Sequence, residues 1–238
     1  MHIKLINFIR DYYRSKDPIP LHAPVFCGNE KQYINDAIET TFVSSIGQYV
    51  KRFENDMMNY TSAPMAVATV NGTAALHASL KIAGVGPNDL VITQPLTFVA
   101  TCNAISYLGA EPVFVDVDMK TLGLSALSME KWLIENAEID DQGLCKTKRD
   151  KKIIRACLPM HTFGHPADLS GLIKVADNWK LSLIEDASES LGSFYKEKHT
   201  GTFGDFGTLS FNGNKIITTG GGGMILTNNV LGLLAKHI

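Results

Sequence analysis

The sequence predicts an α/β fold with a mainly parallel sheet flanked by helices. Short apolar runs typical of buried strands alternate with longer stretches of helical periodicity, and helical crossovers of this kind join parallel strands. The chain has 238 residues, 45% of them hydrophobic and 19% charged, so it can bury a sizeable core. We expect residues 1–40 to form an N-terminal segment with a helix, and residues 41–238 to form one large domain.

The elements follow in order along the chain. In the second helix, Tyr49, Phe53 and Met57 recur every four positions and share one face, and Pro64 follows its end. The predicted helices span residues 30–41, 47–61, about 71–83, 98–108 and 169–180. The predicted strands span residues 65–70, 90–93, 112–117, 153–160, 181–186, 208–211 and 224–227, and the last two would close the sheet. The polar segment 139–152 predicts an excursion or a hairpin at the surface.

Composition and charge exclude several classes of partner. The formal net charge of −2 gives no electrostatic footprint for nucleic acid or for an anionic membrane surface. The first ten residues lack the pattern of a signal peptide, and no run is long and apolar enough to span a membrane. The four cysteines show neither metal-ligand spacing nor a disulfide pattern. We therefore expect a cytoplasmic protein that binds small polar or anionic molecules.

Polar residues follow the first strand of the predicted sheet, at Asn71-Gly72-Thr73. In doubly wound sheets, ligands bind at the carboxyl ends of the strands, where loops meet helix N-termini. The backbone N–H groups of Thr73 and Ala74 would point at an anion such as a phosphate, with the helix dipole behind them. An ordinary helix N-cap with a tight turn is the alternative interpretation, because Asn and Thr are common caps.

An acid and an amine stand at two later strand ends. Asp186 ends the apolar strand 181–186, where a protonated pyridine nitrogen would be a suitable partner; a helix N-cap is the alternative. Lys215 lies in a small-residue loop between two apolar strands. An amine in such a loop can point at a ligand and form a Schiff base, whereas a lysine taken at random is a solvated surface charge. The Ser210 hydroxyl could bind the same anion as the Asn71 turn.

Three further patterns carry less information. The glycine run 220–223 is not a phosphate-binding P-loop, because no Gly-Lys-Ser/Thr ends it and no helix pattern follows closely. His161 and His165 are four residues apart, but Gly164 and Pro166 indicate a loop and no third ligand is near, so we predict no metal site. Phe98 stands at a strand-to-helix junction, where its ring could stack on a flat cofactor or simply pack in the core.

Eight short motifs occur in a fixed order along the chain. They are PLHAP (20–24), FVSSIG (42–47), NGTAAL (71–76), QPLTFVATCNAI (94–105), EPVFVD (111–116), HTFGHP (161–166), EDASES (185–190) and SFNGNK (210–215). Together they resemble the DegT/StrS family of pyridoxal phosphate (PLP)-dependent sugar aminotransferases, which implies the fold type I, aspartate aminotransferase-like architecture. The versions FVSSIG and SFNGNK look most like the LegC-type branch, which is associated with bacillosamine and legionaminic acid precursors.

The resemblance implies a role for each matching residue. Lys215 would form the Schiff base with the cofactor and later move a proton between the cofactor and the sugar carbon. Asp186 would hold the pyridinium nitrogen. Glu189 stands where many relatives place Gln or His, so it would put a second carboxylate beside the phenolic oxygen or the sugar. The phosphate would be bound by Gly72, Thr73, Ala74 and Ser210, the ring would stack on Phe98, and the substrate would lie near His161 and Asn214.

The implied reaction is a ping-pong transfer of an amino group from glutamate to the keto carbon of a nucleotide-linked 4-keto-6-deoxy sugar. The branch resemblance points to UDP-2-acetamido-4-keto-6-deoxyhexose. Amination of a 3-keto sugar and a non-catalytic PLP-fold protein that binds a sugar nucleotide are the alternatives. Family members resembling this chain run well beyond 238 residues. We therefore expect the small C-terminal domain to be largely absent here, and the intact protein to be a homodimer with shared active sites.

Overall fold

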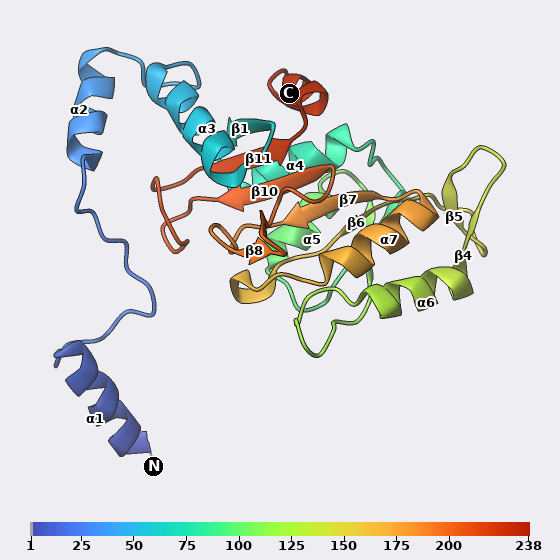
Figure 1. The fold of residues 1–238 in the computed structure, drawn as a ribbon, viewed down its shortest axis with the longest axis horizontal. Coiled ribbons are helices and arrows are strands. Elements are labelled where there is room, and N and C mark those ends of the chain that lie inside the picture. Colours follow the sequence, from blue (N-terminus) through green and yellow to red (C-terminus); the bar gives the residue numbers. More distant parts are fainter. Residues whose placement is uncertain (1) are drawn as a thin grey trace.

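A seven-stranded sheet forms the centre of the molecule (Figure 1). The computed structural model describes residues 2–238. All strands of this sheet run parallel to one another except β11, which is antiparallel to both its neighbours, so the predicted mainly parallel sheet is confirmed. In sheet order the strands are β1 (Met65–Thr69), β11 (Gly223–Thr227), β10 (Phe206–Ser210), β7 (Ser182–Asp186), β6 (Ile154–Leu158), β2 (Leu90–Thr93) and β3 (Glu111–Phe114).

Helices cover both faces of the sheet and make three layers. One face packs against α4 (Gly72–Ile82), α5 (Val99–Ser106) and α8 (Asn229–Ala235). The other face packs against α3 (Gln48–Thr61), α6 (Ala126–Asn136) and α7 (Leu169–Trp179). Alternation along β2 separates the two cores, because Val91 packs with α4 and α5 while Ile92 packs with α6 and α7.

The position of β11 differs from the prediction that the last two strands would close the sheet. β11 lies inside the sheet between β1 and β10, and β1 and β3 form the edges. Loop 211–222 reverses the chain, so β11 runs antiparallel to β10 and also pairs with β1. The base of this loop is held by Phe211, whose N–H donates to Gly222 O at 2.9 Å. Ser210 at the end of β10 lies beside Gly72 at the start of α4.

The other differences between the predicted and the observed elements occur where the sequence pattern is weak. Three helices were not predicted: α1 (His2–Tyr13), α6 and α8. In α6 the buried Met129 and Leu133 are four residues apart, but the exposed Leu127 obscures the period. The glycine run leads directly into β11 and not into a helix, and α8 begins only after that strand. The surface hairpin is confirmed, because β4 (Ala137–Ile139) pairs antiparallel with β5 (Cys145–Thr147).

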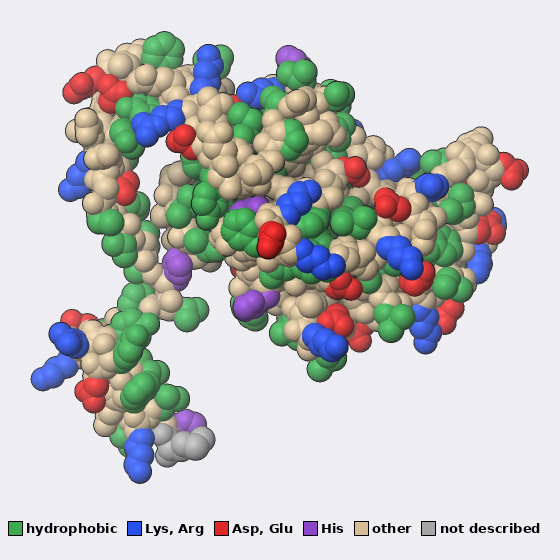
Figure 2. All heavy atoms as spheres, in the orientation of Figure 1, with side chains coloured by type: hydrophobic (Ala, Val, Ile, Leu, Met, Phe, Trp, Pro, Cys, Tyr) green, Lys and Arg blue, Asp and Glu red, His purple; other side chains and the backbone are tan. Residues whose placement is uncertain are grey.

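The N-terminal segment contrasts with this layered body. Neither α1 nor α2 (Glu30–Glu39) buries a residue, and the chain that joins them extends away from the body (Figure 1). Figure 2 shows hydrophobic side chains on the surface of this segment. The segment is fixed to the body at α2, since Asp36 Oδ2 accepts from Gln48 Nε2 at 3.0 Å and from the Tyr49 hydroxyl at 2.8 Å, and at His22, whose Nε2 lies 3.1 Å from Lys215 O. No helix within residues 2–238 combines the length and the apolar character that crossing a bilayer requires.

Candidate active site

A cavity of about 320 Å³ opens at the carboxyl ends of the central parallel strands. Ligands of open α/β sheets bind at this edge, and the volume lies within the usual range for small-molecule sites. The walls come from five separate stretches: the β1–α4 junction, the start of α5, the segment after β6, the end of β7 with the turn that follows it, and the end of β10 with loop 211–222. The lining residues are Asn71, Gly72, Thr73, Leu76, Phe98, Ala100, Met160, Asp186, Ser188, Glu189, Ser210, Asn212, Asn214 and Lys215.

Lys215 lines this cavity and lies beside Glu189. Its Nζ is 3.2 Å from Glu189 Oε1, and the two side chains are 14% and 35% exposed. Lys215 is therefore not a solvated surface charge. Its backbone is held at both ends, because the N–H donates to Asn212 O at 3.0 Å and the carbonyl oxygen accepts from His22 Nε2 at 3.1 Å.

Asp186 also lines the cavity and is only 4% exposed. Its Oδ2 accepts from the Thr101 hydroxyl at 2.7 Å, and its Oδ1 accepts from Ser188 N–H at 3.2 Å. The Thr101 hydroxyl is in turn 2.7 Å from the Thr97 hydroxyl. The alternative interpretation of Asp186 as a helix N-cap is wrong, since a turn and no helix follows β7. Neutral donors hold the carboxylate in place and leave its charge uncompensated.

A cradle of small polar groups lies where α4 begins. A Cβ added to Gly72 would lie 2.9 Å from Ser210 Cβ, 3.2 Å from Ser210 Oγ and 3.4 Å from Ser188 Oγ. Any side chain at position 72 would therefore fill the space between the helix and the two hydroxyl groups. Gly72 keeps this space open, and the hydroxyls of Ser188 and Ser210 border it.

The backbone amides at the start of α4 divide into two roles. Ala74 N–H donates to Asn71 Oδ1 at 2.7 Å, so Asn71 is a helix N-cap. The expectation that Ala74 N–H points at an anion is corrected by this bond. The N–H group of Thr73 has no hydrogen-bond acceptor among residues 2–238, as usual for a first helical turn, whereas the backbone before Gly72 is held in a parallel bridge between Asn71 and Gly222; Gly72 and Thr73 both line the cavity. The N-cap therefore leaves an N–H group of this helix end available to an anion.

Two of the other predicted residues lie at the mouth of the cavity. Phe98 is the residue before α5 and is 65% exposed, so its ring is not part of the core. Asn214 lines the cavity next to Lys215, and its Oδ1 accepts from Asn212 Nδ2 at 2.9 Å. Both positions are open to a molecule that enters the cavity.

The structure does not bring His161 to the cavity. The side chain is 0% exposed, and its Nε2 lies 3.1 Å from Glu185 Oε2. Its Nδ1 accepts Ala167 N–H at 3.2 Å, which uses both ring nitrogens. The expected substrate contact of His161 is therefore not supported by its position. Within residues 2–238, no three His, Cys, Asp or Glu side chains meet closely enough to hold a metal ion.

Glu185, the partner of His161, is an internal carboxylate behind the site. Its Oε1 accepts N–H from Phe203 at 2.6 Å and from Gly204 at 2.9 Å, and its Oε2 accepts Gly201 N–H at 2.8 Å. Burial raises the pKa of Glu185, but the hydrogen bonds from His161 and the backbone amides outweigh it and hold the pKa below its ordinary value. Glu185 thus ties loop 200–204 to the end of β7.

Two residues that shape the site were not predicted. Ser188 borders the cradle and also donates its N–H to Asp186. A serine two residues after a strand-terminal aspartate is a turn signal that could have indicated this contact. Thr101 reaches Asp186 from α5, 85 residues away in sequence, and no local pattern indicates such a contact.

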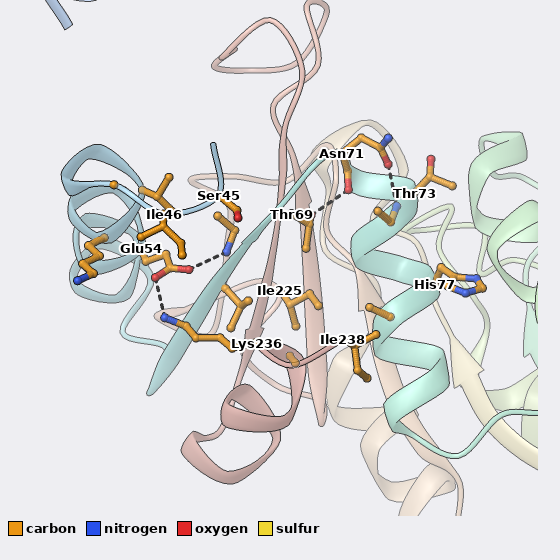
Figure 3. A pocket seen from close by; sticks show the side chains of 18 of the residues that line it. Ser45, Ile46, Glu54, Thr69, Asn71, Thr73, His77, Ile225, Lys236 and Ile238 are labelled. Carbon is orange, nitrogen blue, oxygen red and sulfur yellow. Dashed lines mark hydrogen bonds and ion pairs between the residues drawn. The ribbon is translucent and has the colours of Figure 1, made fainter. Parts of the chain in front are cut away.

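A larger cavity of about 1160 Å³ lies beside the first, along the edge strand β1 (Figure 3). The two cavities share Asn71 and Thr73. The carboxylate in the larger one, Glu54, is already occupied, because Oε1 accepts Ala68 N–H at 3.1 Å and Oε2 accepts from Lys236 Nζ at 2.8 Å. The smaller cavity, by contrast, is lined both by an acid with spare acceptor positions, Asp186, and by an amine, Lys215.

Known proteins resemble this chain in both sequence and fold. A family model described as the DegT/DnrJ/EryC1/StrS aminotransferase family matches residues 26–237. The chain is 40% identical over 211 residues to a GDP-perosamine synthase of Escherichia coli O157:H7, covering 89% of this chain and 53% of that protein. It is 38% identical to the putative pyridoxal phosphate-dependent aminotransferase EpsN of Bacillus subtilis, covering 89% and 52%. An aminotransferase structure from Psychrobacter cryohalolentis matches with a TM-score of 0.79 at 30% identity, covering 92% and 52%.

These matches confirm the aminotransferase-like fold class. They also show how much of each known protein this chain corresponds to. The chain spans about half the length of the curated relatives it matches. Helix α1 lies before the first matched residue of the family model. Membership of the family implies PLP as the cofactor. From the ordered motifs, the sheet topology and the match over residues 26–237, the chain belongs to the DegT/DnrJ/EryC1/StrS aminotransferase family.

Proposed function

We propose that this chain forms the cofactor site of a cytoplasmic, PLP-dependent sugar-nucleotide aminotransferase. One observation carries the proposal: a single small cavity brings together the Lys215 amine, the Asp186 carboxylate and the cradle between Gly72 and Ser210. These groups correspond to the aldehyde, the ring nitrogen and the phosphate of PLP. Since the chain spans about half the length of its relatives, the activity of the whole protein is part of the proposal.

The cradle fits a phosphate group. The N–H groups of Gly72 and Thr73 stand at the start of α4, where the helix dipole favours an anion. The hydroxyls of Ser188 and Ser210 border the space that a Cβ at Gly72 would occupy. We therefore assign the phosphate to these four residues and omit Ala74, whose N–H is used by the N-cap.

Asp186 fits a protonated ring nitrogen. Its carboxylate is buried and held by the neutral donors Thr101 and Ser188, so a nearby cation would be stabilised by its full charge. PLP, when bound, supplies an electron-withdrawing ring that stabilises negative charge on the carbon next to the amine nitrogen. Asp186 keeps the ring nitrogen protonated for this purpose, and Phe98 at the mouth offers a flat face to the ring.

Lys215 performs the covalent and proton-transfer steps. Its Nζ is the cavity amine that would hold the cofactor covalently. Once released, the same Nζ would be the base that moves the proton during the transfer of the amino group. Glu189 Oε1 lies 3.2 Å from this nitrogen.

The proposed substrates are glutamate and a nucleotide-linked 4-keto-6-deoxy sugar, specifically UDP-2-acetamido-4-keto-6-deoxyhexose. The motifs at 42–47 and 210–215 support this sugar, and a nucleotide-linked sugar also appears in the name of one similar protein, GDP-perosamine synthase. Asn214 at the cavity mouth is placed to contact the sugar. We further propose a homodimer with shared active sites. Phe98 at the cavity and its chain neighbour Val99 are apolar and exposed, as is Ile216 next to Lys215, and a second subunit that covered them would bury this apolar surface.

The test is amination by the purified protein with glutamate and a panel of UDP- and GDP-linked 3-keto and 4-keto sugars. We expect a 4-amino product, identified by mass spectrometry and NMR, and sedimentation as a dimer. Lys215→Ala should lose glutamate-dependent amination completely, because no other amine lines the cavity in residues 2–238. Lys174→Ala, on the exposed face of α7, is the matched control and should keep full activity.

Three outcomes would contradict parts of this proposal. Amination that survives in Lys215→Ala would remove Lys215 from the reaction. A 3-amino product would replace the 4-keto assignment, and a monomer with full activity would remove the shared site. Binding of sugar nucleotide without any amination would favour the non-catalytic alternative.

A further inference from the structure

Helix α1 has an apolar face that the rest of the molecule leaves uncovered. Its apolar residues follow the i, i+3, i+4, i+7 spacing that places side chains on one side of a helix: Leu5, Phe8, Ile9 and Tyr12. All four are exposed, Phe8 to 66% and Tyr12 to 75%. No residue of α1 is buried, and the helix stands apart from the layered body (Figure 1).

Cations flank this apolar face on both sides. Residues four apart are neighbours on a helix surface, so Lys4 lies beside Phe8 and Arg10 lies beside Ile6. Among residues 2–238, neither cation has an acidic partner within ion-pair distance. The helix contains one acid, Asp11. Helix α1 is therefore amphipathic, with a basic rim along its apolar face.

Charge is divided unevenly between this end of the chain and the rest. Residues 1–17 contain four of the 22 Lys and Arg residues but only two of the 24 acids, which leaves 18 cations against 22 acids in residues 18–238. The overall charge of −2 thus conceals a basic N-terminal end and an acidic body. An anionic surface would attract the first and repel the second.

The position of α1 suits a role outside the aminotransferase fold. The helix ends before residue 26, where the match to the family model begins, so the shared fold does not account for its apolar face. Residues 14–29 contain no helix or strand and meet the body at His22, whose Nε2 lies 3.1 Å from Lys215 O. This linker lets α1 lie on a surface that the body itself does not touch.

We propose that α1 is an interfacial helix that docks this protein on an anionic lipid surface. Helices of this kind lie in the plane of the membrane, with Phe and Leu in the boundary between head groups and acyl chains and with Lys and Arg at the head groups. Helix α1 is about 18 Å long and has both features. The flanking cations favour lipid over a protein groove, because a groove would take the apolar face and leave Lys4 and Arg10 without partners.

The test is co-sedimentation of the whole chain with vesicles of phosphatidylcholine alone, or of an equal mixture of phosphatidylcholine and phosphatidylglycerol. We expect binding to the anionic vesicles, release by added salt, and much weaker binding to phosphatidylcholine. Phe8→Ser should weaken binding to the anionic vesicles about tenfold, because it removes an aromatic ring from the apolar face. Arg10→Glu should also weaken it about tenfold, because attraction to the head groups becomes repulsion.

Two matched controls separate α1 from the rest of the surface. Ile38→Ser removes an exposed apolar side chain from α2, and Lys51→Glu reverses an exposed charge on α3. Neither change should alter vesicle binding. Amide hydrogen exchange, followed by mass spectrometry, should show protection of residues 2–13 on the anionic vesicles. Phe8→Ser and Arg10→Glu should unfold in urea like the wild type, because α1 buries nothing against the body.

Unchanged binding in both Phe8→Ser and Arg10→Glu would overturn the inference, as would equal binding of the wild type to the two kinds of vesicle. Protection of the body in place of residues 2–13 would also overturn it. If Phe8→Ser changed the sedimentation of the protein without vesicles, the apolar face would belong to a contact with a second copy of this chain. No sugar, amino donor or cofactor is used, so the result is independent of the proposed function.

Discussion

Glu185 and Asp186 are neighbours at the end of β7, but they serve opposite sides of the sheet. Both are buried, with 0% and 4% of their surfaces exposed. Glu185 receives four hydrogen bonds, two on each oxygen, from three backbone amides and His161. Asp186 receives two, one on each oxygen. A carboxylate has roughly four acceptor positions, so the protein saturates Glu185 and leaves Asp186 with capacity that faces the cavity.

The comparison shows that burial does not by itself mark a functional acid. Glu185 is the more buried of the two and has a pKa held below its ordinary value, yet every contact it makes is internal. Asp186 is distinguished by its position in the cavity wall and by its unfilled acceptor positions. We therefore expect changes at Glu185 to affect folding and changes at Asp186 to affect cofactor binding. The following predictions are ordered by their expected effect on the free energy of unfolding.

Glu185→Gln should cause the largest loss of stability. The carboxamide keeps the volume but presents N–H groups to backbone donors, so buried amides of loop 200–204 lose their acceptor. We expect the free energy of unfolding, measured by urea denaturation, to fall by about 3 kcal/mol. Glu111→Gln at the exposed start of β3 is the control and should change it little. A loss below about 1 kcal/mol at Glu185 would show that the internal network does not stabilise the fold.

The pH dependence of stability should change with the same substitution. The folded pKa of Glu185 lies below the unfolded value of about 4.3, so its contribution is fully present above that pH and is lost as the pH falls through the folded pKa. Unfolding free energies of the wild-type protein should therefore decrease as pH falls below about 4.3. The Gln variant should show a shallower decrease over the same range. Parallel curves would assign the acid sensitivity to other groups.

Asp186→Asn should cost less stability than Glu185→Gln. An amide can still accept from Thr101 or Ser188, so we expect a loss of about 1 kcal/mol in the same urea experiment. PLP affinity, titrated by cofactor absorbance, should fall about 10- to 100-fold, because the charge facing the ring nitrogen is gone. The contrast between the two acids would break down if this variant unfolded as easily as Glu185→Gln, or if it bound PLP as tightly as the wild type.

Sequence patterns predicted the parts of the site that are local. Asp186 and Ser210 stand at strand ends, Asn71-Gly72-Thr73 opens a helix, and each has a signature within a few residues. The contacts that decide their roles are not local. Thr101 reaches Asp186 across 85 residues, and Glu189 reaches Lys215 across 26. Local patterns also failed at His161. This residue follows β6, where a substrate residue would be expected, but its ring contacts Glu185 and not the cavity.

The sequence by itself determined the α/β class, the mainly parallel strands, the loop that carries Lys215 and, through its ordered motifs, the family. These features depend on periodicity and short-range turn chemistry, which neighbouring residues encode. Only the tertiary structure decided that β11 enters the sheet between β1 and β10, and that Glu189 rather than Asp186 pairs with Lys215. It also decided that Glu185 is internal while Asp186 faces the cavity. Strand order and side-chain partners depend on which distant segments pack together, and hydrophobic periodicity does not specify that packing.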